Sequence, residues 1–163
     1  MSRYTNITTD IWKDPDFRTM SYPSKLLYLY LLTADNSNIA GMYRLCEEDI
    51  LRNVGQEALD AFKEGNRLWV YDRKTETLLL PNYLKYNVAK SPQQFKAMNS
   101  AIRTLSWSEL FVEWMYYVLR YCGDNALNYI EGTIKKYVQT KAAQLETREA
   151  FVVREILKDT SSL

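Results

Sequence analysis

The sequence contains no histidine among its 163 residues and only two cysteines, Cys46 and Cys122. The missing histidine removes the commonest general base and the commonest protein ligand of metals. Two cysteines are too few for a zinc cluster, and their wide separation is typical of reduced thiols in a cytoplasmic protein. We therefore expect neither a metal centre nor a cofactor.

Patterns typical of catalysis and of membrane insertion are also missing. There is no nucleophile paired with a base, no P-loop and no glycine-rich dinucleotide turn, which predicts a non-enzymatic protein. The acidic residues Asp14, Asp16 and 47–49 do not belong to a recognisable metal-binding pattern. They are typical of helix-capping or solvated groups. The N-terminus has no signal-peptide pattern, and the most apolar run, residues 26–32, is too short to span a bilayer. We expect a cytoplasmic protein without a membrane partner.

The pattern of helical and strand-like segments predicts a mostly helical α+β fold. Pro23 favours the start of an apolar helix over about residues 23–34, in which we expect Leu29 to be fully buried. A strand over 39–45 and two short helices separated by Gly55 follow, and Gly65 ends the second helix. The expected helices and hairpin strands after residue 45 are 46–54, 56–64, 67–72, 77–83 and 92–104.

Two helices followed by a hairpin, with an apolar helix in front, is the order of a winged helix-turn-helix. We assign residues 1–104 to this domain. Residues 105–163 form a predicted helical extension that serves oligomerisation or partner binding.

Five segments resemble the N-terminal winged-helix domain of phage replisome organisers, the DnaD-like replication initiation proteins of phages of low-GC Gram-positive bacteria. They are Trp12-Lys-Asp-Pro-Asp-Phe-Arg, Ser24-Lys-Leu-Leu-Tyr-Leu-Tyr-Leu-Leu-Thr, Ile39-Ala-Gly-Met-Tyr-Arg-Leu, Asn82-Tyr-Leu-Lys-Tyr-Asn and Lys90-Ser-Pro. The resemblance covers roughly residues 3–100 and implies that the protein binds origin DNA and helps to assemble replication proteins, such as a helicase or a helicase loader. Family members usually continue into a separate C-terminal DNA-binding domain, whereas only residues 105–163 follow here.

Two other functions remain open. One is a phage-encoded, protein-binding inhibitor of host defence or host replication, and the other is a transcriptional regulator. The short extension after residue 104 is compatible with the first of these.

Basic residues are concentrated in and after the expected hairpin. Residues 66–104 carry seven basic and two acidic side chains, whereas residues 1–65 carry seven basic and ten acidic ones. The expected recognition helix, 56–64, has three acids against one base, which disfavours major-groove reading. We therefore expect weak, backbone-directed DNA binding by the hairpin, in which tyrosines stack on unpaired bases. The alternative is that these charges only solvate the hairpin. The candidate nucleic-acid residues are Arg67, Arg73, Lys74, Tyr83, Lys85, Tyr86, Lys90 and Lys96.

The expected extension is aromatic on more than one side, which predicts two packing surfaces, one on its own domain and one on a partner chain. The alternative is a single intramolecular core. A further apolar stripe begins at Leu127 and continues through Leu145 and Val152 towards Ile156. Because projecting apolar helices usually pair, we expect a homo-oligomer, most simply a homodimer. The candidate partner-binding residues are Trp107, Phe111, Trp114, Tyr117 and Tyr121.

Overall fold

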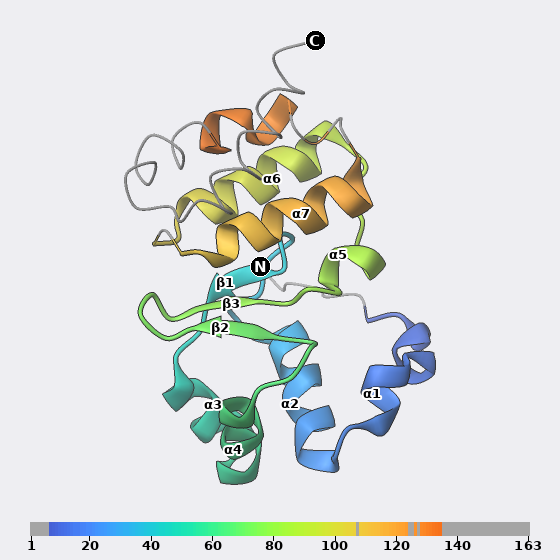
Figure 1. Ribbon diagram of the computed structural model, residues 1–163, viewed down its shortest axis with the longest axis vertical. Helices are drawn as coiled ribbons and strands as arrows, with labels where there is room; N and C mark the ends of the chain where they lie inside the picture. Colours follow the sequence, from blue (N-terminus) through green and yellow to red (C-terminus); the bar gives the residue numbers. More distant parts are fainter. Residues whose placement is uncertain (1–6, 107, 124–125, 127, 135–163) are drawn as a thin grey trace.

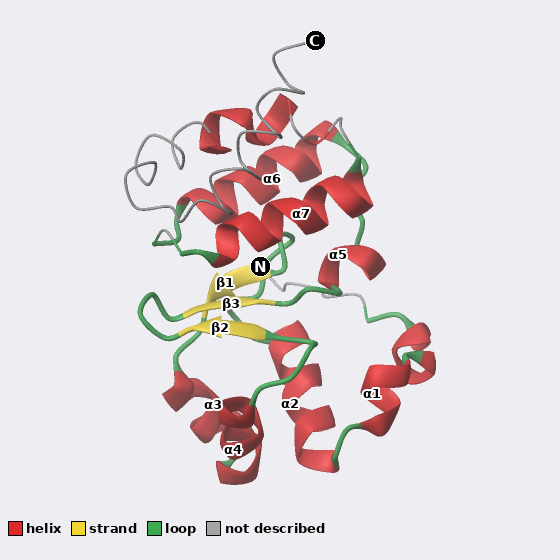
Figure 2. Cartoon of the chain, in the orientation of Figure 1, coloured by secondary structure: helices red, strands yellow, loops and turns green. Residues whose placement is uncertain are grey.

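The computed structural model describes residues 7–106, 108–123, 126 and 128–134. They form a mostly helical α+β fold, which confirms the expected class. A small three-stranded sheet lies between two groups of helices (Figure 2). No helix within this described part is long and apolar enough to cross a membrane.

The helices lie on both sides of the sheet (Figure 1). One side carries η1 (Thr9–Lys13), α1 (Pro15–Thr19), α2 (Tyr22–Thr33), α3 (Glu47–Val54) and α4 (Gln56–Glu64). The sheet contains β1 (Met42–Arg44), β2 (Val70–Asp72) and β3 (Thr77–Leu79). The other side carries α6 (Pro92–Arg103) and α7 (Leu110–Cys122), with α5 (Tyr83–Tyr86) beside the end of the sheet.

Local capping chemistry accounts for several of these helix ends. The Ser21 hydroxyl accepts a hydrogen bond from the backbone N–H of Ser24 at the start of α2. Ser91 and Gln94 form a reciprocal capping box at the start of α6, where Pro92 occupies the first turn. Gly55, with φ of 102°, separates α3 from α4 in a conformation that disfavours other residues. These helix positions therefore follow from short-range sequence signals.

The sheet is antiparallel with the strand order β1-β3-β2. Its central strand, β3, is completely buried. The hairpin strands are shorter than expected, and Tyr83 begins α5 instead of ending a strand. Pro81 comes one residue after Leu80, whose N–H still donates to Gly41, and it has no N–H with which to continue the ladder. The backbone N–H of Tyr83 then donates to the carbonyl of Leu80 at 3.0 Å.

Helix α7 packs on the sheet and on α5, so the described part of residues 105–163 shares one hydrophobic core with the first 104 residues. The indole N–H of Trp114 donates to the carbonyl of Ala40 at 2.9 Å, and the Trp114 side chain has no exposed surface. Ile130 and Ile134 are buried in the same core. The expected domain boundary at residue 104 stays a prediction, but the core continues across it.

Helix α2 is less enclosed than its composition predicts. Leu27 and Leu31 are fully buried, whereas Leu29 is only partly buried and Leu26 is 56% exposed. The helix packs against α3 and α4, and Tyr28 and Leu32 are buried towards η1 and α1, while Tyr22 and Leu26 face solvent. The expectation that Leu29 is fully buried is therefore wrong.

Two identical substitutions on α2 test this assignment of its buried face. We expect Leu31→Ala to lower the free energy of unfolding by about 2–5 kcal/mol, because it removes buried surface and leaves a cavity. Leu26→Ala should change it by no more than about 0.5 kcal/mol, since that side chain is largely exposed. Urea denaturation followed by circular dichroism measures both, and equal losses would contradict the assignment.

Candidate nucleic-acid interface

The turn between β2 and β3 is held by the side chain of Asp72. One carboxylate oxygen accepts from the backbone N–H of Lys74 at 3.0 Å, and the other accepts from the Thr75 hydroxyl at 2.8 Å. Burial acts to raise the pKa of Asp72, but hydrogen bonds from Ser108, Thr75 and the backbone outweigh it, so that this pKa lies below its ordinary value. The turn is therefore a fixed loop that presents the next two residues to solvent.

Arg73 and Lys74 are exposed on this turn. The Arg73 guanidinium Nε lies 3.5 Å from a carboxylate oxygen of Glu47 at the start of α3, and the ammonium of Lys63 on α4 lies 3.5 Å from the other oxygen. The Arg73 side chain remains 67% exposed. Because such surface ion pairs are weak, Arg73 can exchange Glu47 for a phosphate group. Arg73 and Lys74 can then both contact the phosphate backbone of a nucleic acid.

Helix α4 presents a negative surface beside this turn. Glu57, Asp60 and Glu64 are exposed, and Lys63 is paired with Glu47. Phosphate groups are repelled by such a surface. The geometry therefore disfavours reading of the major groove by α4, as the sequence predicts.

The remaining basic candidates do not converge on the turn. The Arg67 guanidinium lies 3.3 Å from Asp16 of α1. Lys96 is exposed on α6. Lys85 belongs to α5, which lies at the opposite end of the sheet from the β2–β3 turn (Figure 1). The predicted basic cluster is thus divided over several faces of the molecule.

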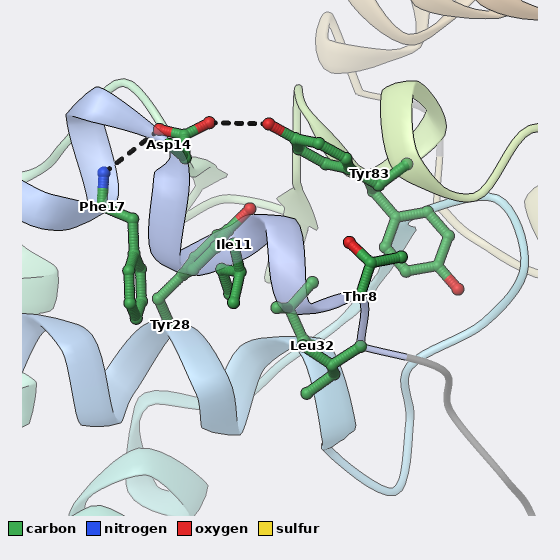
Figure 3. A pocket seen from close by; sticks show the side chains of 9 residues that line it. Thr8, Ile11, Asp14, Phe17, Tyr28, Leu32 and Tyr83 are labelled. Carbon is green, nitrogen blue, oxygen red and sulfur yellow. Dashed lines mark hydrogen bonds between the residues drawn. The ribbon is translucent and has the colours of Figure 1, made fainter.

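Tyr83 has a structural position, and the expectation that its ring stacks on bases is wrong. Only 8% of this residue is exposed, and its ring packs directly over Gly41, where an added Cβ would come within 2.6 Å of the Cβ of Tyr83. Tyr83 also lines a small cavity of about 30 Å³ beneath η1 (Figure 3). No ring face is left for a nucleotide.

The hydroxyl of Tyr86 is engaged by a buried carboxylate. One Asp14 oxygen accepts from the backbone N–H groups of Asp16 and Phe17 and so caps α1, while the other accepts from the Tyr86 hydroxyl at 2.9 Å (Figure 3). Burial and, second, this hydrogen bond raise the pKa of Tyr86. Asp14 and Tyr86 therefore join α1 to α5 across 72 positions of the chain.

A second charged surface forms where α5 meets the C-terminal half of α7 (Figure 1). The Lys85 ammonium lies 5.0 Å from the ring centre of Tyr86. The Arg120 guanidinium lies 5.9 Å from the ring centre of Tyr116 and 5.5 Å from that of Tyr121. We call this surface the tyrosine–arginine face, and it consists of Lys85, Tyr86, Tyr116, Tyr117, Arg120 and Tyr121.

The rings of this face are arranged against one another. Tyr117 and Tyr121 lie nearly parallel with ring centres 6.3 Å apart, and Tyr116 meets Tyr117 edge to face. The Tyr117 hydroxyl donates to Glu113 at 3.3 Å. Burial and, second, the Glu113 carboxylate raise the pKa of Tyr117 to about 12. Tyr117 therefore remains neutral at physiological pH.

The candidate partner-binding residues have separate positions. Phe111 and Trp114 are buried under α7, so the expectation that they bind a partner is wrong, because the sheet and α5 already cover that side of the helix. Tyr117 and Tyr121 are partly buried in the tyrosine–arginine face. Trp107 lies outside the described residues.

The structure brings together Lys85 and Tyr86 from the nucleic-acid candidates with Tyr117 and Tyr121 from the partner-binding candidates. Sequence reasoning missed Arg120, which lies four positions after Tyr116, as a member of this group. Their spacing of four positions on a helix is a signal that could have identified the pair, since such residues are neighbours on the helix surface.

Within the described residues, no three acidic, cysteine or histidine side chains form a group that could hold a metal ion. Comparison of the chain with protein-family models, curated proteins and solved structures found no match. The features that point to a function are the two charged surfaces and the resemblance of the sequence segments.

Removal of a single hydroxyl tests the structural position of Tyr86. We expect Tyr86→Phe to lower the free energy of unfolding by about 1–3 kcal/mol, because the buried Asp14 oxygen loses its side-chain donor. Tyr22→Phe is the matched control, since Tyr22 is 88% exposed and should show no measurable change. Urea denaturation measures both variants, and equal stability of the two would show that the hydrogen bond contributes nothing.

Proposed function

We propose that this chain is a non-enzymatic phage replication-initiation protein that binds origin DNA in the cytoplasm and helps to assemble replication proteins. The observation that carries the proposal is the exposed Arg73–Lys74 pair on a rigid hairpin turn that follows two short helices. The resemblance of five sequence segments to phage replisome organisers supports the same function.

The order of elements supports a winged helix as the finer description of the fold. Helix α2 precedes β1, and α3 and α4 are joined at Gly55 and are followed by the β2–β3 hairpin. In this description α4 is the recognition helix and the β2–β3 turn is the wing.

The charges on α4 and on the β2–β3 turn favour one mode of DNA binding. The exposed acids of α4 repel phosphate, whereas Arg73 and Lys74 face solvent on the wing. Contacts of these cations with the phosphate backbone carry no sequence information. We therefore expect weak binding that falls steeply as salt is added.

A charge reversal on the wing tests this mode. We expect the double variant Arg73→Glu, Lys74→Glu to weaken the binding of all duplex sequences alike. The slope of log K against log salt should become less negative by about 1.8, because each lost phosphate contact accounts for about 0.9. Fluorescence anisotropy with two unrelated duplexes over a salt series measures both quantities.

The control reverses two exposed cations elsewhere, Lys13→Glu and Arg18→Glu, with the same change in net charge. It should retain most of the affinity. Intact binding by the wing variant, together with lost binding by Lys63→Glu, would place the DNA on α4 and contradict the proposed mode.

One observation favours a second function from another class. Lys63 of α4 and Arg73 of the turn are paired with Glu47, and Arg52 of α3 lies 4.0 Å from Asp49. The exposed surface of α4 is acidic, as expected for a surface that meets a basic protein. A protein-binding inhibitor of host defence or host replication would use this surface. Duplex binding that is absent even at low salt would favour it over replication initiation and over transcriptional regulation.

We also expect the protein to be a homodimer held mainly by residues after 105. Phe111, Trp114, Ile130 and Ile134 belong to the core of the chain itself, so the contact has to use other residues of the extension. The stripe through Leu145, Val152 and Ile156 lies outside the described residues, and its support comes from its sequence pattern.

Light scattering on the full chain at micromolar concentration should give the mass of a dimer, and Leu145→Glu with Val152→Glu should give that of a monomer. Gln144→Glu, which adds one charge off the stripe, is the control. The full chain is required because removal of residues after 105 would expose the core under α7. A monomeric unsubstituted protein would refute this expectation.

A further inference from the structure

The tyrosine–arginine face combines aromatic rings with cations. Tyr116 is 51% exposed, and Arg120 lies beside it with a guanidinium N–H donating to the Tyr116 hydroxyl at 2.9 Å. Lys85 is exposed on the neighbouring helix. The face therefore offers ring surface and positive charge in the same place.

A third cation lies close to this surface. Burial raises the pKa of the Cys122 thiol and the backbone N–H of Ala89 acts to lower it, so Ala89 and the adjacent exposed Lys90 lie near the C-terminal end of α7. Two carboxylates border the face among the described residues: Glu113 of α7 accepts from Tyr117, and Asp14 accepts from Tyr86. They stand against the three cations Lys85, Lys90 and Arg120. Positive charge therefore predominates.

Attachment of α7 to the rest of the chain does not depend on this face. The helix is held from its other side by the buried side chains of Phe111, Trp114 and Val118. An exposed contact between a cation and an aromatic ring contributes only about 0.5–1 kcal/mol to stability. Tyr116 and Arg120 thus have little structural reason to lie together on the surface.

We propose that the tyrosine–arginine face binds single-stranded nucleic acid. Unpaired bases stack on aromatic rings and on guanidinium planes, while neighbouring cations contact the phosphates. In a duplex the faces of the bases are already stacked on one another, so the rings favour single strands. Stacking is tolerant of sequence, and binding without sequence preference follows.

This site goes beyond duplex binding by the wing and is physically separate from it. The β2–β3 turn lies at one end of the sheet, and α5 with the C-terminal end of α7 lies at the other (Figure 1). The cations would also fit an acidic peptide. Binding of acidic side chains, however, would make no use of the tyrosine rings, whereas unpaired bases stack on them.

Fluorescence anisotropy of the full-length protein with a labelled oligothymidylate tests the proposal. The double variant Tyr116→Ala, Arg120→Ala should bind about tenfold more weakly, as expected for the loss of base stacking and of a phosphate contact. The conservative variant Tyr116→Phe, Arg120→Lys keeps one ring and one charge and should regain most of the affinity. Circular dichroism should show that both variants remain folded.

The matched control is Tyr22→Ala with Lys25→Ala on α2. There, too, a cation lies over an exposed tyrosine ring, at 5.7 Å from its centre. This control should bind the oligothymidylate as the unsubstituted protein does. An equal loss in both double variants, or no binding of the oligothymidylate at low salt, would overturn the proposal.

Two further measurements separate this proposal from the others. The wing variant Arg73→Glu, Lys74→Glu should lose duplex affinity and keep the oligothymidylate, so failure of duplex binding would refute only the proposed function. If Tyr116→Ala with Arg120→Ala changes the mass in light scattering but leaves oligothymidylate binding intact, the face binds a second copy and the proposal is wrong.

Discussion

The buried hydrogen bond from the Trp114 indole to the Ala40 carbonyl is the interaction on which the arrangement of layers depends. It joins α7 to the segment that leads into β1. The carbonyl of the next residue, Gly41, accepts a hydrogen bond from the backbone N–H of Leu80 at 2.8 Å. Gly41 also packs under Tyr83 of α5. Helix α7, the segment before β1 and α5 therefore meet at two consecutive residues, and the tyrosine–arginine face is formed by the two helices that meet there. An unpaired carbonyl buried at such a place would cost about 1–3 kcal/mol.

The two charged surfaces differ in how their cations are used. On the hairpin side, Arg73 lies opposite Glu47, which also holds Lys63, so positive charge is partly neutralised by the neighbouring helices. On the opposite end, Arg120 lies over the rings of Tyr116 and Tyr121. A guanidinium over aromatic rings can bind an anion directly, whereas a guanidinium beside a carboxylate must first break that ion pair. The difference arises from which residue types the fold brings beside each cation.

The elements with local signals could be predicted from the sequence, and the long-range contacts could not. Pro23, Ser91 and the glycines at 55 and 65 placed the ends of four helices through capping chemistry that acts within one turn. Periodicity could not predict that Phe111 and Trp114 would face the sheet and not a partner, because both sides of α7 are aromatic. The contact of Asp14 with Tyr86 and the meeting of Lys85 with α7 depend on the tertiary arrangement, and no spacing along the chain encodes them.

The contact between Gly41 and Tyr83 limits how this chain can diverge. Gly41 has φ of +66°, and an added Cβ would lie 2.6–2.7 Å from three carbon atoms of the tyrosine. A side chain at position 41 is therefore strained by the backbone conformation whatever the space, and it also needs residue 83 to be smaller. A smaller residue at position 83 would open a gap against η1 and α2. The two positions are therefore coupled in evolution. Because either substitution alone is harmful, we expect the glycine and the tyrosine to be retained together.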